Sequence, residues 1–315
     1  MSTNSFFNDS RTVDKFSQSF GDRVRFGEIL APYVAYRVGG PADILVFPKN
    51  EADLNRISEL SLELGLPITI IGTGTNLLVR DEGIRGITVS LLQAFQQIES
   101  LDSTPSGTYL VRSGGGVGKP ELLEWAVKRG LTGLEFSAGV PGTIGGGIFM
   151  NAGTKYGCYG DILREIRLYD FESGARQLKT QQSQFGYREQ KLVSGSLVLW
   201  TLFELKMGDS VTIRREVDRI IAERAEKQPL DYPSCGSTFK NPEGLSAGRL
   251  IERAGLKGLQ IGGAVISEKH ANFILNRENA KAQDILDLID VIKKKVREQF
   301  SVELECEVII LGSAQ

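Results

Sequence analysis

The chain has 315 residues, a formal net charge of −2, and 41% hydrophobic and 24% charged residues, the composition of a soluble globular protein with two or three compact units. The charge balance excludes an overall basic field for nucleic acid, so an anionic ligand must be bound by local positive groups. The longest apolar runs are short strands, well below the roughly 20 residues that cross a bilayer, and we expect no membrane association.

The N-terminal segment, residues 1–22, is rich in Ser, Asn and Asp and has no apolar run of the kind that signal peptides carry. We predict that it is a flexible tail. The three cysteines are odd in number and widely spaced, so they form neither a disulfide framework nor a metal-ligand pattern. This usage indicates a reducing compartment, the cytoplasm. Because His270 is the single histidine, metal sites built from several histidines are excluded.

Strands and helices alternate along the first part of the chain. An amphipathic helix is predicted over residues 51–64, where Gly65 ends it, and a second over 121–129, where Pro120 stands at the first position and Gly130 follows the last. Runs of β-branched and apolar residues predict strands over 43–48, 67–71, 86–91 and 109–112.

Short strands and turns dominate from residue 166 to residue 205, which indicates β-rich structure. The composition becomes more charged near residue 209, and we place a domain boundary there. Beyond it, the pattern predicts helices over 212–227, 247–254 and 279–300 and an alternating strand over 302–311. The sequence thus predicts a glycine-rich α+β part followed by a smaller α+β unit.

Glycine is enriched, at 36 residues in the chain, and glycines cluster in four places. Two of these groups, residues 70–76 and 141–147, are loops in which successive backbone N–H groups can form an anion-binding concavity. Each loop alone is explained equally well by tight turns around a packed core. Two such loops in one domain of a near-neutral chain favour a diphosphate ligand.

The familiar nucleotide motifs do not fit these glycines. Leu77 stands where a dinucleotide-binding fold needs a third small residue, and no clear helix follows it. Gly118-Lys119 resembles the end of a phosphate-binding P-loop, but Ser113 holds the leading glycine position and Pro120 replaces the hydroxyl residue. The sequence therefore supports neither a P-loop kinase nor a Rossmann dehydrogenase.

Polar groups are concentrated in the loop 233–242, which contains two prolines, Gly236, Ser237, Lys240 and Asn241. Its hydroxyl, ammonium and amide groups can bind a polar ligand and donate a proton to it. The alternative is a solvated connector, the commonest role of such a loop.

Three further groups of side chains each allow two interpretations. Arg224 and Lys227 lie three residues apart on one helix face, where they either attract an anionic substrate or face solvent. His270 is either a base or a structural residue beside apolar neighbours. Glu305 and Glu307 alternate along a strand and so project from one face, either into solvent or into an active site.

Seven spaced motifs then occur in one particular order, between about residue 24 and residue 312. Together they closely resemble the UDP-N-acetylenolpyruvoylglucosamine reductase family, flavoenzymes of bacterial cell-wall precursor synthesis. The motifs are residues 36–42, 72–79, 139–151, 187–188, 236–242, 269–276 and 304–308.

The resemblance implies an α+β fold with a two-part FAD-binding domain of the vanillyl-alcohol-oxidase (PCMH) type, over residues 23–209 and split near residue 90. Residues 210–315 would form a smaller substrate-binding domain whose last strand returns to the FAD domain. The implied reaction is the NADPH-dependent, FAD-mediated reduction of the enolpyruvyl group of UDP-N-acetylglucosamine enolpyruvate to UDP-N-acetylmuramate. A cytoplasmic monomer without nucleic-acid or membrane partners is expected.

The resemblance also implies roles for individual residues. Ser237 would be the proton donor, with Arg188 and Glu307 completing the catalytic set. Residues that match the family's FAD contacts, chiefly backbone contacts to the diphosphate, are Arg37, Gly72, Thr73, Gly74, Thr75, Asn76, Pro141, Gly142, Thr143, Gly145, Gly146 and Asn151. Residues that match its UDP-sugar contacts are Tyr187, Arg224, Lys227, Asn241 and Asn272.

Two departures and two alternatives accompany this interpretation. Thr75 stands where the family often has serine, which keeps the hydroxyl. The stretch between Arg188 and Ser237 is too short for the extra substrate-clamping loop of one subgroup, so the chain resembles the subgroup that lacks it.

Another flavin oxidase on the same fold would explain the glycine loops but not residues 224–308. A non-catalytic binding module would bind a UDP-sugar without NADPH-dependent reduction of the flavin.

Overall fold

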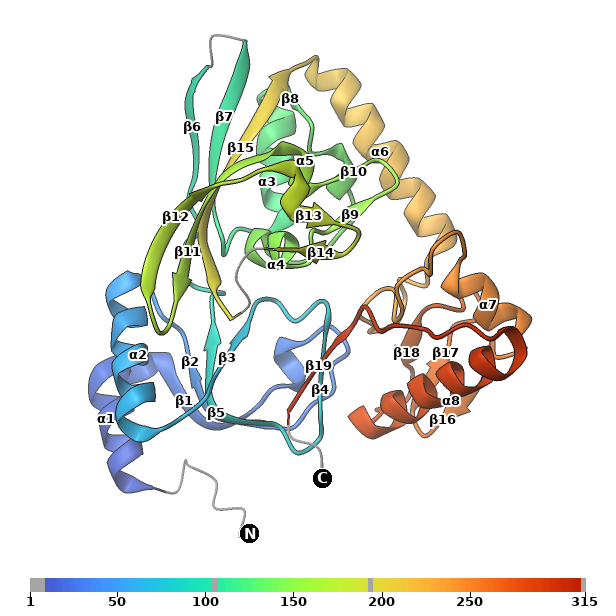
Figure 1. Ribbon diagram of the computed structural model, residues 1–315, viewed down its shortest axis with the longest axis horizontal. Coiled ribbons are helices and arrows are strands. Elements are labelled where there is room, and N and C mark those ends of the chain that lie inside the picture. The colour runs from blue at the N-terminus through green and yellow to red at the C-terminus, as the bar shows by residue number, and fades with distance from the viewer. Residues whose placement is uncertain (1–8, 104–106, 192–194, 313–315) are drawn as a thin grey trace.

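The first of three lobes is built on a four-stranded sheet of order β1-β2-β5-β3 (Figure 1). The computed structural model describes residues 9–103, 107–191 and 195–312 of the chain. The sheet of the first lobe packs against α1 and α2, and its core contains apolar residues of both helices and of the strands. The elements are α1 (Ser10–Phe20), β1 (Val24–Ile29), β2 (Pro41–Val46), α2 (Glu51–Leu64), β3 (Ile68–Ile71) and β5 (Ile84–Ser90).

Helix α2 occupies the residues that the sequence predicts. The Asn50 side chain accepts a hydrogen bond from the N–H of Asp53 and so caps the N-terminus. Leu54, Ile57 and Leu60 form its buried face. Gly65 ends the helix in the left-handed conformation, at φ 64°, which costs glycine little.

The predicted flexible tail is wrong over residues 10–20, which form α1. The Asp9 carboxylate accepts from the N–H of Thr12 at the start of the helix. Phe16 is 0% exposed and Phe20 is 3% exposed, and both lie in the core of the first lobe. Two aromatic residues four positions apart are enough to anchor one face of an otherwise polar helix. The part of the predicted tail in residues 1–8 lies outside the described residues.

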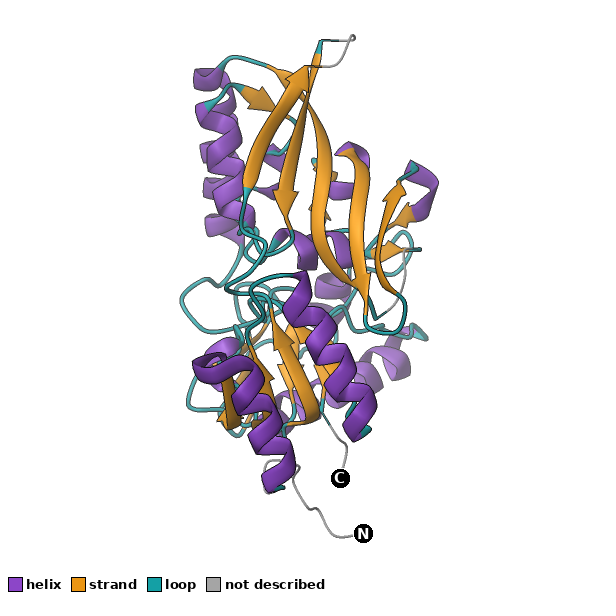
Figure 2. Ribbon diagram, turned by 90° about the vertical axis from the view of Figure 1, so that its left-hand side faces the viewer, coloured by secondary structure: helices purple, strands orange, loops and turns teal. Residues whose placement is uncertain are grey.

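The second lobe stands above the first in Figure 2 and is built on a larger sheet of order β12-β11-β15-β7-β6, with β8 paired to β15. Strand β15 (Leu197–Met207) is central, because β11 and β7 pair with it on opposite sides. The other strands of this sheet are β6 (Ile98–Ser103), β7 (Thr108–Gly114), β8 (Leu131–Thr132), β11 (Leu163–Asp170) and β12 (Gly174–Lys179).

Helices and two short hairpins cover this sheet and carry much of the site described below. The helices are α3 (Lys119–Lys128), α4 (Ile144–Phe149), α5 (Tyr159–Ile162) and α6 (Ser210–Lys227). The hairpins are β9 (Gly153–Thr154) with β10 (Gly157–Cys158), and β13 (Phe185–Gly186) with β14 (Glu189–Gln190).

Helix α6 corrects the predicted domain boundary near residue 209. Its buried residues Ile213, Val217 and Ile220 belong to the core of the second lobe, together with residues of α3 and β15. The charged sequence of α6 suggested a new unit, but the apolar stripe on the helix packs backwards onto the sheet that precedes it. The third lobe therefore starts after Lys227.

The third lobe has its own core, in which α8 packs against α7 and a small sheet of order β16-β17-β18. Tyr36, Val38 and Leu78 of the first lobe enter the same core, so the two lobes share a continuous apolar seam. The elements of the third lobe are α7 (Ala247–Arg253), β16 (Gln260–Ile261), β17 (Ala264–Ile266), β18 (Ile274–Asn276) and α8 (Ala282–Phe300).

Helix α8 begins three residues later than predicted because of a cap from far away in sequence. The carboxylate of Asp81, in the first lobe, accepts hydrogen bonds from the N–H groups of Ala282 and Gln283 at 2.9 and 3.0 Å. These are two of the N–H groups that have no partner inside a helix. The cap also ties the first lobe to the third.

After α8 the chain crosses back to the first lobe, where β19 (Ile309–Leu311) pairs in parallel with β4 (Leu77–Val79) (Figure 1). The strand predicted over 302–311 is wrong for its first part, since only 309–311 form a strand. The rest runs beside the loop 236–240, with one bridge between Phe239 and Cys306. Along the described ranges, no helix is long and apolar enough to cross a membrane.

Candidate active site

Two glycine loops face each other between the first and second lobes. We call residues 72–76 the first glycine loop and residues 141–147 the second. A Cβ on Gly72 would lie 3.0 Å from Thr143 Oγ1, and a Cβ on Gly142 would lie 2.8 Å from Thr75 Oγ1. Each glycine thus lies close to a threonine hydroxyl of the opposite loop, and the two loops form a narrow cradle; Gly142, at φ 114°, is also in a conformation that favours glycine.

The two loops differ in the hydrogen-bond donors that they offer. In the first glycine loop, the backbone N–H groups of Thr73, Gly74 and Thr75 have no acceptor among the described residues. In the second, the N–H groups of residues 144–147 are already bonded, to Val117 O, Gly115 O, Thr143 Oγ1 and Thr143 O. The sequence predicts several free donors in each loop. In the second loop, hydrogen bonds at the start of α4 occupy most of these N–H groups.

An orphaned polar atom supports a ligand at this cradle. Thr73 Oγ1 is buried and has no hydrogen-bond partner in the part of the chain that the structure describes. A buried hydroxyl without a partner costs free energy unless a ligand or water supplies one. Free N–H donors, a lone hydroxyl and glycines that permit close approach are the features that an FAD diphosphate needs. The predicted cofactor residue Arg37 is exposed at the surface of the first lobe.

Lys119 lies at the edge of the cradle. Its ammonium donates a hydrogen bond to the carbonyl of Pro141 at 3.1 Å, and a Cβ on Gly142 would lie 3.2 Å from Nζ. The side chain is among the buried ones, and no carboxylate pairs with it within the described ranges. Burial, with the nearby positive charges of Arg188 and Arg224, lowers the pKa of Lys119 to about 8.

Arg188 sits at the tip of the β13–β14 hairpin, in the left-handed conformation at φ 56°. Asn151 holds this hairpin in place. Its side chain donates to Gly186 O at 2.8 Å and accepts from Gly160 N at 3.0 Å. Both ends of the Asn151 amide are therefore occupied by the protein, which gives no support to the predicted cofactor contact. Asn151 positions the hairpin that carries Arg188.

Arg188 and Glu307 form an ion pair between the second lobe and the C-terminal segment. Arg188 Nε donates to Glu307 Oε1 at 2.6 Å. The two terminal Nη groups of Arg188 have no acceptor among described residues and remain available to a ligand. Burial raises the pKa of Glu307 from its ordinary value, and the charge of Arg188 opposes that rise.

The loop that contains Ser237 runs antiparallel to the segment that contains Glu307. Lys240 N donates to Glu305 O at 2.9 Å, and Glu307 N donates to Thr238 O at 2.8 Å. The Ser237 hydroxyl is half-buried and makes no hydrogen bond to any described residue, so its proton is uncommitted. The predicted catalytic residues Ser237 and Glu307 thus lie on adjacent segments.

The Asn272 side chain is bonded to the backbone of this loop. Its side chain accepts from Phe239 N at 3.0 Å and donates to Phe239 O at 2.8 Å, and it is 3% exposed. Asn76, in the first glycine loop, is also bonded to protein backbone: its amide donates to Glu307 O at 2.9 Å. The predicted UDP-sugar contact of Asn272 therefore gains no support from the structure.

A pocket of about 300 Å³ opens beside the ion pair. Lys240 and Glu305, which pair at 2.5 Å, line it as well. Ser237 is not among the lining residues. The full lining is Phe149, Met150, Arg188, Glu189, Gln190, Lys240, Glu305, Cys306, Glu307, Val308 and Ile309.

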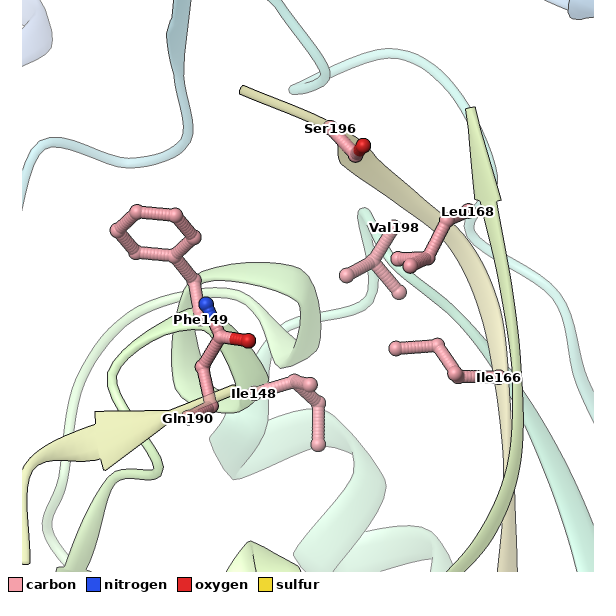
Figure 3. Close-up of a pocket in the computed structure, with 7 residues that line it drawn as sticks. All are labelled: Ile148, Phe149, Ile166, Leu168, Gln190, Ser196 and Val198. Atoms are coloured by element: carbon pink, nitrogen blue, oxygen red, sulfur yellow. The ribbon is translucent and has the colours of Figure 1, made fainter. Parts of the chain in front are cut away.

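A second, much smaller cavity lies between α4 and the face of the sheet formed by β11 and β15 (Figure 3). Ile166, Leu168 and Val198 project into it from the strands, and Ile148 from α4. Its volume is about 10 Å³, which is room for one water molecule. The second lobe is closely packed here.

The remaining predicted UDP-sugar residues lie on the second and third lobes and are not among the residues that line the larger pocket. The Tyr187 hydroxyl accepts from Asn241 N at 3.3 Å, across the gap between the second and third lobes. The Asn241 side chain accepts from Ala247 N at 3.0 Å, so only its NH₂ group is free. Arg224 is half-buried and has no ion-pair partner in the described chain, whereas Lys227 pairs with Glu223 at 2.8 Å.

Two side chains that invite a chemical role have structural ones. His270 Nδ1 accepts from Asn272 N at 3.2 Å, and burial lowers the pKa of the ring. Burial also raises the pKa of Cys235 to about 12, which leaves an inert thiol beside the reactive-looking loop.

Sequence reasoning missed the place of Lys119 in the site. In the sequence, Lys119 stands out only as part of a P-loop-like motif that does not fit. The signals present in the sequence were its position between Gly118 and Pro120 and its place at the start of a helix. Neither reveals that a side chain at a helix start turns inward.

Comparison with known proteins identifies the family. The model of the FAD binding domain matches residues 42–177, and the model of the UDP-N-acetylenolpyruvoylglucosamine reductase C-terminal domain matches residues 228–311. The reductases of that name from Clostridioides difficile and Latilactobacillus sakei are 42% and 43% identical to this chain, over 92% of it and 93% of each relative. The chain belongs to the UDP-N-acetylenolpyruvoylglucosamine reductase family.

A solved structure agrees with this assignment. The reductase from Thermus caldophilus superposes with a TM-score of 0.76 and 33% identity, and the match covers 90% of this chain and 98% of that one. The predicted family and the α+β fold with a FAD-binding domain are confirmed. The C-terminal family model begins at residue 228, directly after α6, in agreement with the third lobe as the structure defines it.

Proposed function

We propose that this protein is the NADPH-dependent flavoenzyme that reduces the enolpyruvyl group of UDP-N-acetylglucosamine enolpyruvate to give UDP-N-acetylmuramate, for peptidoglycan synthesis. The observation that carries the proposal is the position of the Arg188–Glu307 pair, in a 300 Å³ pocket next to the glycine cradle of a FAD-binding domain. The names of the relatives supply the substrate class. A cytoplasmic monomer is part of the proposal.

The cofactor fits the residues present. The first glycine loop offers free N–H donors and the Thr73 hydroxyl, and Gly142 of the second loop allows close approach. Bound FAD supplies the hydride chemistry that no side chain provides, with NADPH as the source of electrons. The side chains then have three tasks: to hold the substrate, to stabilise developing charge and to deliver a proton.

Arg188 is proposed to bind the carboxylate of the enolpyruvyl group. Hydride addition at C3 moves negative charge from C2 toward that carboxylate. The free Nη groups of Arg188 suit it as a planar donor pair, while Nε stays fixed by Glu307. A donor group held in place before the reaction stabilises the charge without reorganisation.

Ser237 is proposed to protonate C2. A serine hydroxyl is a weak acid, but a carbanionic centre at hydrogen-bond distance is a strong base and needs only a positioned donor. The Ser237 hydroxyl has no competing partner among the described residues. Lys240 or water would return the proton to it.

Glu307 is proposed to orient Arg188 and the enolate-like centre. It is buried next to Arg188, and its backbone is fixed from two sides, by Thr238 O and by the Asn76 amide. A carboxylate held so firmly can keep the Arg188 fork in one plane.

An anaerobic titration of the purified protein tests this function. We expect a yellow protein whose flavin absorbance bleaches with NADPH and returns when UDP-N-acetylglucosamine enolpyruvate is added. Oxygen consumption with a sugar or alcohol substrate, without a response to the UDP-sugar, would indicate another flavin oxidase instead. Binding of the UDP-sugar by a protein whose flavin NADPH does not reduce would indicate a binding module.

A further inference from the structure

Three positively charged side chains gather near the second glycine loop, and among the residues that the structure describes only one of them has a carboxylate partner. Arg188 pairs with Glu307. Lys119 and Arg224 have no acidic partner in the part of the chain that the structure describes. The positive charges of Arg188 and Arg224 both act on Lys119. A ligand that brings negative charge would relieve the mutual repulsion of these groups.

Lys119 is the most buried of the three, at 6% exposed. Its Cε would lie 2.8 Å from a Cβ on Gly147, and its Nζ 3.2 Å from a Cβ on Gly142. The same Cβ on Gly142 would lie 2.8 Å from Thr75 Oγ1. The ammonium therefore reaches the point where the two glycine loops meet, rather than solvent.

A purely structural role explains Lys119 poorly. Among the described residues its one hydrogen-bond partner is the carbonyl of Pro141, and an ammonium has three donors. Burying a charge with a single neutral partner costs more free energy than the bond returns, and an apolar side chain of the same length would avoid that cost. Burial removes water from the ammonium, and this is the main reason for its lowered pKa. No carboxylate among the described residues acts in the opposite direction.

We propose that the Lys119 ammonium binds the anionic diphosphate of the flavin cofactor where the first and second glycine loops meet. This inference rests on the proposed function, since it requires that the protein binds FAD. The backbone donors of the first glycine loop and the Thr73 hydroxyl would hold one side of the diphosphate, and Lys119 would neutralise its charge. Gly142 and Gly147 are glycines in part because Lys119 must pass them.

Cofactor binding to the apoprotein tests the proposal without any turnover. Wild type, Lys119→Met and the control Lys128→Met are stripped of flavin and titrated with FAD and, separately, with riboflavin, which has no diphosphate. Lys128 lies on the same helix but its side chain is 69% exposed. Loss of a charge-assisted hydrogen bond predicts a rise of about 10- to 100-fold in the Kd for FAD with Lys119→Met. Lys128→Met should bind FAD as wild type does.

The riboflavin series separates binding of the anionic diphosphate from binding of the flavin ring. If Lys119 binds the diphosphate, riboflavin binds wild type and Lys119→Met equally. An equal loss of riboflavin and FAD affinity would place the ammonium at the flavin ring and overturn the proposal. Unchanged FAD affinity in Lys119→Met would also overturn it. Wild type that binds no FAD at all would instead contradict the proposed function.

A second variant guards against a folding defect. Lys119→Gln keeps a donor for the Pro141 carbonyl but removes the charge. We expect it to fold like wild type, as judged by circular dichroism and thermal unfolding of the apoprotein, and to show the same loss of FAD affinity. FAD binding at the wild-type level by Lys119→Gln would show that the Pro141 hydrogen bond, not the charge, is what matters.

Discussion

Arg188 and Glu307, which are far apart in the sequence, meet at 2.6 Å across the boundary between the second lobe and the C-terminal segment. The hairpin that carries Arg188 is held by Asn151, and the segment that carries Glu307 is held by Thr238 and Asn76. The pair is thus fixed from both sides before any ligand arrives, which is the condition for electrostatic stabilisation of a transition state.

Arg188→Lys should lower turnover with the UDP-sugar by about 10²-fold, because lysine keeps the charge but lacks the planar donor pair. Reduction of the flavin by NADPH should change little. Stopped-flow absorbance of the two half-reactions measures both effects. A wild-type rate of flavin reoxidation by the substrate would exclude a role of the Arg188 fork in stabilising the enolate.

Ser237→Ala should slow flavin reoxidation by the substrate about 10²-fold or more, because the proton donor to C2 is removed. Flavin reduction by NADPH needs no such donor and should remain fast. The measurement is again stopped-flow absorbance at the flavin maximum. Equal slowing of both half-reactions would point to a general disturbance of the site and count against Ser237 as the acid.

Glu307→Gln should slow the substrate half-reaction about 10²-fold, since the neutral amide no longer fixes the Arg188 guanidinium by charge. Glu303→Gln is the matched control. Glu303 lies four residues away, and its side chain is 70% exposed and pairs with Arg297. It should stay within about 3-fold of wild type, because exposed ion pairs contribute little. Equal losses in the two variants would remove the special role of Glu307.

Asn272→Ala should destabilise the protein by about 2–4 kcal/mol, because it leaves both the N–H and the carbonyl of Phe239 buried without partners. Asn272→Asp keeps the acceptor for the N–H but buries a charge and turns an oxygen toward the Phe239 carbonyl, so at neutral pH it should cost at least as much as the alanine change. Urea unfolding of the two variants gives the comparison. An alanine variant as stable as wild type would mean that water replaces the amide.

The stability of the apoprotein should depend on pH through Lys119. Its pKa is about 8 in the folded protein, below its usual value of 10.5. Between these values the unfolded chain binds more protons, so stability rises with pH. Relative to Lys119→Met, wild type should gain about 2 kcal/mol between pH 7.5 and pH 10. Urea unfolding at both pH values measures this, and an unchanged difference between the two proteins would contradict the buried, unpaired ammonium.

Local signals in the sequence were enough for much of the fold. Helix α2 is predicted over the residues that form it, because its cap, its apolar spacing and Gly65 all lie within the helix or next to it. The start of α8 is different. Asp81, two hundred positions earlier, supplies the cap, and no local pattern contains that information.

The site was predictable in its residue types but not in its contacts. The glycine loops, Ser237 and the glutamate pair are visible in the sequence, and the family resemblance chose Glu307. Whether an asparagine side chain is free to bind a ligand or is bonded to the protein depends on the residues that other parts of the fold place beside it. Asn151 and Asn272 both have their side chains engaged by backbone groups of other segments. Only the folded structure shows that the Lys119 side chain turns inward, toward the meeting point of the two glycine loops.

A single-turnover experiment tests the central claim most directly. The purified flavoprotein is reduced anaerobically with NADPH, separated from excess nucleotide and mixed with UDP-N-acetylglucosamine enolpyruvate. Mass spectrometry of the UDP-sugar should then show a product heavier by two hydrogen atoms, one molecule for each flavin reoxidised. Unchanged UDP-sugar beside a flavin that stays reduced would contradict the account.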